Sequence, residues 1–427
     1  MEKEEENVFK ALGVESKEDA VTNAIVHALR HSENFKKEFL KLIYGDEISC
    51  QESRAYARRK FGKAIPDICI ICKYPNGEVR ITIIENKLFA KEGYKQMEKY
   101  KEAENNICII CKNAYSNNGD HEKQKECSST AQAQIPVDTK SNNGDHEKPK
   151  ECSVKYVYLV LFEEKPSCED VHVMMHKDLL KLKDVLSRDV FAEGIILDWI
   201  DLLKDFYDQG SISEDAEVFE KLKPKSGLDG SYLFFRKLFT SNDESKGSNI
   251  LPNGLFVHSF FRTNSTSDHY YGAVISKSGW ISEEKIIVEQ SGDNVQVPEK
   301  NYNIHFELQY STVHRKFKLL LHYETNPYKG ERWQKNHAEK LKSYNALREQ
   351  FKKELLENFN KKGLARLQLA GEAGEAKWKF GGRTNQIAKV EFSVPKKMTV
   401  SEFREKLRSY IEDAIEEIDG VIAKVLR

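Results

Sequence analysis

The chain of 427 residues lacks any long apolar segment, and this absence sets the first limit on its function. No apolar run approaches the roughly 20 residues that a helix needs to cross a bilayer, so we expect no membrane partner. The first residues, MEKEEENVFK, are acidic and contain neither the basic nor the apolar region of a secretory signal. We therefore expect a cytoplasmic protein whose eight cysteines are thiols or metal ligands.

The chain also lacks an excess of charge of either sign, because 67 Lys and Arg balance 68 Asp and Glu. A polyanion such as nucleic acid would therefore have to bind to local basic clusters. The second half of the chain contains no nucleotide-binding glycine loop, no nucleophile elbow and no zinc spacing. A length of 427 residues exceeds what one hydrophobic core usually organises, which predicts two globular units.

The most informative stretch is PDICIICKYPNGEVRITIIENK at 66–87, in which two β-prone runs flank Pro-Asn-Gly at 75–77. Proline suits the second position of a type I turn and glycine supplies a left-handed residue, which together favour a three-residue hairpin loop. In that register Asp67 lies opposite Glu85, and Lys87 shares their face of the sheet. A two-residue Asn-Gly loop would shift the register by one and separate the two acids.

Two facing carboxylates beside a lysine can form a structural ion pair, or they can hold a divalent ion. Carboxylate oxygens suit Mg²⁺ or Mn²⁺, and a nearby ammonium can orient or activate the attacking water. Pro66-Asp67 followed by Glu85-Asn86-Lys87 resembles the PD-(D/E)xK nuclease superfamily. The resemblance implies that Asp67, Glu85 and Lys87 are catalytic, and that the two acids hold the metal with the backbone carbonyl of Asn86.

The resemblance extends to the segments on either side of the hairpin. In LFAKEGYKQMEKYKEAEN, Gln96 and Tyr100 lie one helical turn apart, as in the QxxxY element with which a branch of these nucleases contacts nucleic acid. The family also places a metal-binding acid on its first helix, for which Glu18 is the better candidate and Asp19 the reserve. Ordinary surface or packing roles are the alternative for Gln96 and Tyr100.

Two basic clusters are candidates for phosphate contacts. RAYARRKFGK at 54–63 contains five basic residues and no acid, and a stripe of lysines at i,i+4 spacing follows the hairpin. The candidate residues are Arg58, Arg59, Lys60, Lys91, Lys95 and Lys99. A solvated charged surface is the alternative interpretation.

The hexapeptide ICIICK occurs twice, at 68–73 and at 107–112, and each copy contains Cys-x-x-Cys. Residues three apart on a strand diverge, so Cys69 and Cys72 of the first copy cannot jointly hold a zinc ion. The second copy contains Cys108 and Cys111. A zinc or iron–sulfur site there is not the preferred interpretation, because cysteines in apolar segments are more often small buried hydrophobic residues.

A duplication follows the second copy: SNNGDHEKQKECS at 116–128 returns as SNNGDHEKPKECS at 141–153. Two copies are too few for a solenoid, and their polar composition cannot bury a core. We therefore interpret residues 106–153 as a duplicated low-complexity insertion on the surface.

The order of elements predicts the fold of the first half. Helical periodicity over 18–44, the hairpin, the QxxxY helix and an apolar β-prone run at 155–162 follow in the family's order. We expect a restriction-endonuclease-like αβββαβ core with a mixed sheet in residues 1–208. Amphipathic patterns within 170–208 would complete it, and the histidines at 172 and 176 are interpreted as packing residues.

The second half, 209–427, has the pattern of an α+β domain. Apolar and polar residues alternate at 254–261, 270–276, 301–310 and 316–324, and long helical patterns cover 335–359 and 399–426. Thr399 followed by Glu402 predicts a capping box at the start of the second helix. We expect this domain to position substrate or to form a homo-oligomer.

The sequence as a whole predicts a nuclease that uses Mg²⁺ or Mn²⁺ to hydrolyse phosphodiester bonds of nucleic acid. DNA is the favoured polymer, and defence against foreign DNA is a role in keeping with the resemblance. The alternative is a protein on the same fold that binds nucleic acid, or serves as a scaffold, without cleaving.

Overall fold

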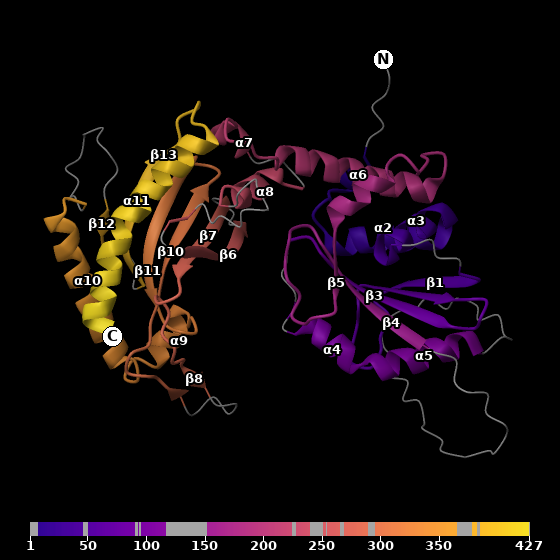
Figure 1. Ribbon diagram of the computed structural model, residues 1–427, viewed down its shortest axis with the longest axis horizontal. Coiled ribbons are helices and arrows are strands. Elements are labelled where there is room, and N and C mark those ends of the chain that lie inside the picture. Colours follow the sequence, from indigo (N-terminus) through magenta and orange to yellow (C-terminus); the bar gives the residue numbers. More distant parts are fainter. Residues whose placement is uncertain are drawn as a thin grey trace. The chain divides into compact units, whose positions relative to one another are not determined.

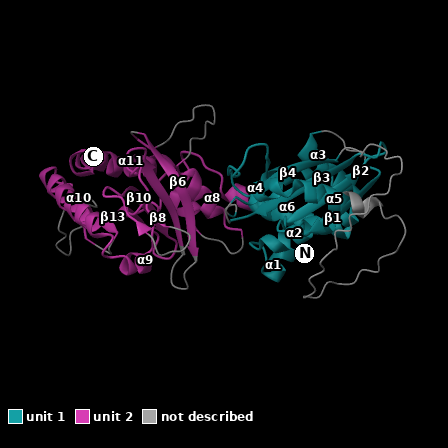
Figure 2. Ribbon diagram, turned by 90° about the horizontal axis from the view of Figure 1, so that it is seen from below, with its two compact units in different colours: residues 1–205 teal, residues 206–427 magenta. Residues whose placement is uncertain are grey.

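Two compact units, residues 1–205 and 206–427, divide the computed structural model of the chain (Figure 2). The boundary lies close to the one expected at 208. The structure describes residues 7–45, 50–89, 93, 95–116, 152–223, 228–239, 251–252, 254–264, 269–288, 295–364, 378–381 and 385–426. No helix in these residues is long and apolar enough to span a membrane.

A five-stranded mixed sheet forms the centre of the first unit. Its strands lie in the order β1-β2-β3-β4-β5, with antiparallel β1–β2 and β2–β3 pairs and parallel β3–β4 and β4–β5 pairs. The bounds are β1 Glu52–Ala57, β2 Ile68–Lys73, β3 Val79–Lys87, β4 Cys152–Val160 and β5 His172–Met175. The expected strands at the hairpin and at 155–162 are confirmed, and β5 is an edge strand that the sequence pattern did not predict.

Helices cover both faces of this sheet (Figure 1). Helices α2 and α3, which confirm the helical periodicity over 18–44, lie on one face, and α4 and α5 lie on the other. Because helices cover both faces of the sheet, the side chains on both faces of β2 and β3 are buried, which explains why these strands are nearly continuous apolar runs in the sequence. The helices are α1 Val8–Leu12, α2 Glu18–His31, α3 Glu33–Tyr44, α4 Gln96–Glu102, α5 Glu104–Ser116, the 3₁₀ helix η1 His176–Leu182 and α6 Phe191–Gln209.

The β2–β3 hairpin has the register that its turn chemistry predicts. Cys69 pairs with Ile83, and the Tyr74 amide donates to the Glu78 carbonyl at 2.9 Å across a three-residue loop. Gly77 supplies the left-handed position of this loop, with φ 82°. The alternative two-residue loop, which would have separated the acids, is thereby excluded.

The expectation that residues 106–153 form a surface insertion is wrong for the two ends of this range that the structure describes. The second ICIICK, at 107–112, lies in helix α5 and not in a surface loop, and β4 already begins at Cys152. Cys111 is fully buried in the cluster between α5 and the sheet, while Ile109 is exposed. Burial at Ile107 and Cys111, four residues apart, with exposure between them is the pattern of a helix. On a strand, side chains two residues apart would share one face, so Ile107, Ile109 and Cys111 would be buried or exposed together. Residues 117–151, with most of the duplication, lie outside the described residues.

A six-stranded antiparallel sheet forms the second unit, in the order β12-β13-β11-β10-β7-β6. Its strands are β6 Leu255–Asn264, β7 His269–Lys277, β10 Asn303–Ser311, β11 Lys316–Glu324, β12 Lys379–Phe380 and β13 Gln386–Ser393, and a separate pair consists of β8 Ile287–Val288 and β9 Val295–Gln296. The helices are α7 Val218–Lys221, α8 Gly230–Lys237, α9 Glu331–Asn336, α10 Lys342–Lys361 and α11 Val400–Val421, which continues as the π-helical turn η3 Ile422–Leu426. The predicted α+β character is confirmed.

Helices α10 and α11 pack on one face of this sheet (Figure 1). Phe317 of β11 stacks on Phe392 of β13 and contacts Phe403 of α11 at centroid distances of 5.5 and 4.7 Å. The predicted capping box begins α11, where the Thr399 hydroxyl accepts from the Glu402 amide and the Glu402 carboxylate accepts from the Thr399 amide. The opposite face of the sheet carries polar side chains, among them His305 and Glu307 of β10 and His322 and Glu324 of β11.

Candidate active site

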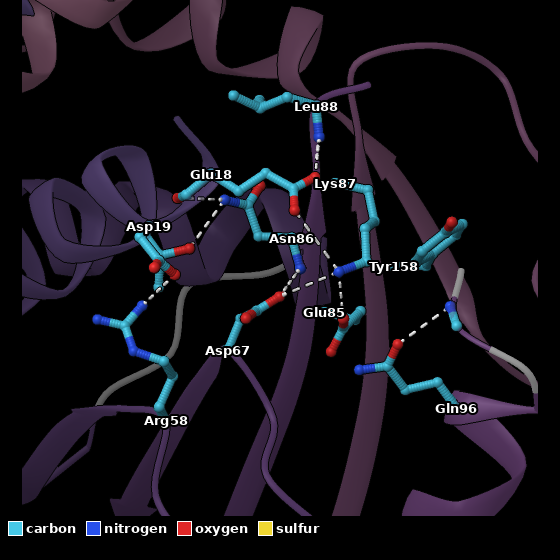
Figure 3. A network of polar contacts seen from close by, with 12 residues as sticks. Glu18, Asp19, Arg58, Asp67, Glu85, Asn86, Lys87, Leu88, Gln96 and Tyr158 are labelled. Carbon is cyan, nitrogen blue, oxygen red and sulfur yellow. Dashed lines mark hydrogen bonds and ion pairs between the residues drawn. The ribbon is translucent and has the colours of Figure 1, made fainter. Parts of the chain in front are cut away.

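Carboxylates from three elements converge on Lys87 of β3 (Figure 3). Its Nζ lies 2.6 Å from Glu85 Oε1, 3.9 Å from Asp67 Oδ2 and 3.8 Å from Glu18 Oε1. Asp67 directly precedes β2, Glu85 lies on β3, and Glu18 is the first residue of α2. The structure thus brings together the predicted catalytic residues and the preferred candidate for the acid of the first helix.

Main-chain amides at the end of β3, those of Asn86 and of the next residue after the strand, Leu88, hold two of these carboxylates in place. The Asn86 amide donates to Asp67 Oδ2 at 2.8 Å, and the Leu88 amide donates to Glu18 Oε2 at 2.9 Å. Hydrogen bonds from main-chain amides to charged oxygens are short and directional. The positions of Asp67 and Glu18 are therefore set by the strand that carries Lys87.

Exposure rises from the centre of the cluster to its edge. The side chain of Glu85 is 1% exposed, that of Asp67 20% and that of Glu18 30%. A surface hollow of about 370 Å³ lies next to Glu18, and its lining includes Glu18, Asp19 and Phe89. The cluster is therefore buried at Glu85 and open to solvent on the side of Glu18.

Burial and charge change the protonation of the cluster. Burial, together with the negative charge of Asp67, raises the pKa of Glu85 to about 7. Burial alone would lower the pKa of Lys87, but its hydrogen bond to Glu85 and the charges of Asp67 and Glu18 raise that pKa above the ordinary value. Lys87 is therefore a cation that three acids share.

The predicted QxxxY pair lies one turn apart on α4, and its contacts differ from those expected. The Tyr100 hydroxyl donates to Glu85 Oε2 at 2.7 Å and accepts from Gln96 Nε2 at 2.8 Å. Tyr100 is 2% exposed. A side chain this deeply buried has little surface for a nucleic acid strand, so its place in the fold is that of a positioning residue for Glu85.

A buried polar chain on the other face of β3 was missed by the sequence reasoning. The Asn86 side chain donates to Thr22 Oγ1 at 2.9 Å, its Oδ1 lies 2.8 Å from His176 Nε2, and Trp199 Nε1 donates to His176 Nδ1 at 3.3 Å. Because His176 Nδ1 accepts, Nε2 carries the proton and donates to Asn86. This chain links α2, β3, η1 and α6 directly behind the carboxylate cluster.

Burial lowers the pKa of His176 to about 3, so its ring is neutral and acts as a hydrogen-bonding spacer. The expectation of a packing role fits His176, which is fully buried, whereas His172 is only partly buried. The signal that sequence reasoning could have used is a histidine within an apolar run, which needs a buried polar partner. Because the Asn86 side chain points away from Lys87, only its backbone remains to serve an ion in the cluster.

Two arginines of the predicted basic cluster, Arg58 and Arg59, which follow β1, make contacts within the protein. Arg58 binds the Asp19 carboxylate at 2.8 Å and Asn23 Oδ1 at 2.7 Å, which removes the reserve candidate Asp19 from the cluster. The guanidinium of Arg59 lies over the Tyr56 ring, 4.2 Å from its centroid. Neither arginine is therefore a freely extended phosphate contact.

The remaining lysines lie at the surface. Lys60, Lys95 and Lys99 are exposed, and Lys95 also pairs with Glu98 at 2.9 Å. Lys91 lies outside the described residues. The exposed lysines are placed where a polyanion can reach them.

The cysteines of the two hexapeptides do not form one site. Their contacts pair Cys50 with Cys72, Cys69 with Cys111, and Cys108 with Cys152, the last with 2.8 Å between sulfur atoms. Cys69 and Cys72 thus diverge as strand geometry predicts. Cys108 and Cys111 have different partners, so the described residues do not join them in a shared thiolate site.

No protein-family model, no curated protein and no solved structure matches this chain. The geometry and chemistry of the cluster around Lys87 are therefore the observations that bear on the function of the first unit.

Proposed function

We propose that the first unit is a nuclease with a restriction-endonuclease-like core, which hydrolyses phosphodiester bonds of nucleic acid with Mg²⁺ or Mn²⁺. We propose DNA as the polymer and defence against foreign DNA as the biological role. The observation that carries the proposal is the convergence of Asp67, Glu85 and Glu18 on Lys87. Glu18 comes from α2, Asp67 from the residue before β2, and Glu85 and Lys87 from β3, in the spacing and order of the family that the sequence resembles.

The donor set fits a hard divalent cation. Three carboxylates face a single ammonium, which leaves negative charge that Lys87 alone does not balance. Oxygen ligands of this kind suit Mg²⁺ and Mn²⁺. Asp67, Glu85 and Glu18 would hold the ion, with the backbone carbonyl of Asn86. When bound, such an ion lowers the pKa of its water and neutralises charge on the reacting phosphate.

The chain's own groups have separate tasks in this proposal. Lys87, whose pKa is raised, remains protonated and so orients water and neutralises phosphate charge; it does not abstract a proton. Tyr100 holds Glu85 in place through its hydroxyl. The Asn86 amide fixes Asp67. Such preorganised donors reduce the reorganisation needed during reaction.

Surface lysines supply the proposed contacts to the polymer. Lys60 and Lys99 are exposed on segments that flank the cluster, since Arg58 lies next to Asp67 and Tyr100 next to Glu85. Lysine contacts to phosphates are independent of sequence and weaken as salt rises. Binding with little base specificity is therefore expected from these residues.

The proposal is tested with the purified full chain on linear duplex, circular duplex and single-stranded DNA and on RNA. Each polymer is incubated with Mg²⁺, with Mn²⁺ and with a chelator. We expect cleavage of at least the duplex DNA with either ion and none with the chelator. If none of the four polymers is cleaved with Mg²⁺ or with Mn²⁺, the nuclease proposal is overturned.

The same samples address the second candidate, a protein that binds without cleaving. Fluorescence anisotropy on labelled polymers would then show binding that persists in the Asp67→Asn variant while no product forms. Cleavage by the wild type decides against this candidate.

A further inference from the structure

The polar face of the second unit's sheet carries two histidines and two glutamates at its centre. His305 of β10 pairs directly with His322 of β11. Glu307 follows His305 by two residues and Glu324 follows His322 by two, so all four side chains share one face. The pattern His-x-Glu thus occurs on both strands of one antiparallel pair.

These side chains lie close enough to share a ligand. His322 Nδ1 lies 3.3 Å from Glu324 Oε1 and 4.0 Å from Glu307 Oε2, and His305 Nε2 lies 4.0 Å from Glu324 Oε2. His305, His322 and Glu324 each offer one donor atom such that all three atoms fall within 4.8 Å. The two imidazole rings have centroids 5.4 Å apart.

The cluster is withdrawn from water, and its polar groups are incompletely satisfied. The side chain of His305 is 5% exposed, and those of the other three residues are 15–17% exposed. His305 Nδ1 and His322 Nε2 are buried and have no hydrogen-bond partner among the described residues. The ring nitrogens that face the carboxylates are the other two, His305 Nε2 and His322 Nδ1, and these are the donor atoms available to an ion between the side chains.

In the part of the chain that the structure describes, neither lysine nor arginine balances the carboxylates of the cluster. No lysine or arginine within the described ranges forms an ion pair with Glu307 or Glu324; their described ion-pair partners are the two histidines. Two carboxylates that are largely removed from water repel each other unless a cation lies between them. A bound cation would supply the missing positive charge.

We propose that His305, His322 and Glu324 bind a divalent transition-metal ion of the zinc class, with Glu307 as a fourth ligand. Imidazole with carboxylate suits Zn²⁺, whereas Mg²⁺ prefers oxygen alone. Tetrahedral zinc with ligands at about 2.0–2.2 Å places its donor atoms about 3.3 Å apart. The three nitrogen–oxygen separations match this spacing or exceed it by less than 1 Å, and all donor atoms of His305, His322 and Glu324 lie within 4.8 Å of one another, so side-chain rotations can complete the site.

This site is independent of the carboxylate cluster around Lys87. It lies in the other unit, uses a different donor set and involves no residue of the nuclease proposal. Either proposal can fail while the other stands.

The experiment measures ion binding by the full chain after removal of metal with a chelator and under reducing conditions. Equilibrium dialysis gives the number of Zn²⁺ and Co²⁺ equivalents for the wild type, for His322→Gln and for His314→Gln. His314 lies exposed in the turn between β10 and β11, so its replacement removes one imidazole from the same hairpin without touching the cluster. We expect His322→Gln to lose one equivalent and His314→Gln to match the wild type.

The absorption spectrum of bound Co²⁺ identifies the ligands. A site of nitrogen and oxygen donors gives visible ligand-field bands without thiolate-to-metal charge transfer, and these bands should disappear in His322→Gln. If His322→Gln and His314→Gln bind the same number of metal equivalents and show the same Co²⁺ bands, the proposal is overturned, because the ion would then be bound elsewhere, for example by cysteines.

Folding of each variant is checked by circular dichroism. Glu324→Gln keeps the shape of the side chain, so it decides the matter if His322→Gln does not fold. We expect Glu324→Gln to bind Zn²⁺ at least about tenfold more weakly than the wild type. Unchanged affinity in a folded Glu324→Gln variant overturns the proposal.

Discussion

Glu85 is the least exposed acid around Lys87, and its surroundings decide the pH at which the cluster can accept a cation. Its pKa is raised to about 7 by burial and by the charge of Asp67, against 4.5 for an ordinary glutamate. Between these two values the folded chain binds a proton that the unfolded chain has released. In the absence of metal, the stability contributed by this group is therefore greatest below pH 4.5 and falls as the pH rises toward 7.

Metal binding should have the opposite pH dependence, because a protonated carboxylate is a poor ligand. We predict that the affinity for Mg²⁺ rises as the pH passes upward through the pKa of Glu85. Isothermal titration calorimetry at pH values on both sides of that pKa measures this, and Glu85→Gln should remove most of the dependence. An affinity of the wild type that does not change with pH would show that Glu85 does not hold the ion.

Tyr100→Phe tests the assigned role of the QxxxY pair. Removing the hydroxyl deletes the hydrogen bond that favours the ionised form of Glu85, so the pKa of Glu85 should rise and metal-dependent cleavage should require higher pH. Loss of one charge-assisted hydrogen bond is worth about 1.5–3 kcal/mol, or roughly tenfold or more in rate. Cleavage rates across a pH series measure the shift.

Tyr156→Phe is the matched control for this substitution. Tyr156 packs in the same apolar cluster, but its hydroxyl faces Glu104 at 2.9 Å and the main-chain carbonyl of Tyr100 at 3.3 Å, and not Glu85. Its removal should leave the pH profile of cleavage in place. A pH profile that shifts equally in both variants would mean that packing, and not the hydrogen bond to Glu85, is responsible.

At the scale of residues, the sequence predicts contacts within one hairpin well, but it predicts contacts between residues that are far apart in the chain poorly. Strand alternation and turn chemistry suffice to place Asp67, Glu85 and Lys87 together, since all three lie on one hairpin. The partners of Tyr100 and His176 depend on which helix covers which face of the sheet. That information is tertiary, so residue type and spacing could not supply it.

At the scale of elements, the hairpin loop sets the register on which the cluster depends. Gly77 adopts φ 82°, a conformation that alanine reaches only at a cost. We predict that Gly77→Ala lowers the free energy of unfolding by about 1–2 kcal/mol, as measured by urea denaturation. Gly194→Ala is the control: it lies inside α6, where the added methyl meets its nearest atom at 3.6 Å and alanine favours the helix. Destabilisation by both changes would contradict this explanation.

The two copies of ICIICK show the limit of local reasoning about elements. One is the central strand β2 and the other lies in α5, although the six letters are identical. A short apolar run has no periodicity that separates a buried strand from a buried helix turn. The neighbouring residues determine which element each copy forms. Pro-Asn-Gly closes a hairpin after the first copy, whereas a stretch rich in Glu and Asn precedes the second copy and continues the helical region that begins with α4.

At the scale of the whole molecule, each unit has its own sheet and its own cluster of ionisable side chains. The cluster of the first unit offers oxygen donors around a lysine, and that of the second offers two imidazoles and carboxylates without a lysine. Different ions are therefore expected to act on them, Mg²⁺ on the first and Zn²⁺ on the second. The repeated His-x-Glu on adjacent strands was a signal for the second cluster that sequence reasoning could have used, because β10 and β11 were both predicted.

The most direct test of the central proposal compares two carboxylate-to-amide changes on the same hairpin. Asp67→Asn alters an acid of the cluster around Lys87, whereas Glu78→Gln alters the acid beside the loop that pairs with Arg80 at 2.7 Å. The measurement is the initial rate of duplex DNA cleavage by the full chain in Mg²⁺. We predict that Asp67→Asn loses at least about a hundredfold in rate, in keeping with the loss of a metal ligand, while Glu78→Gln cleaves like the wild type. Equal rates for the three proteins would contradict the proposal that Asp67, Glu85 and Lys87 form the active site.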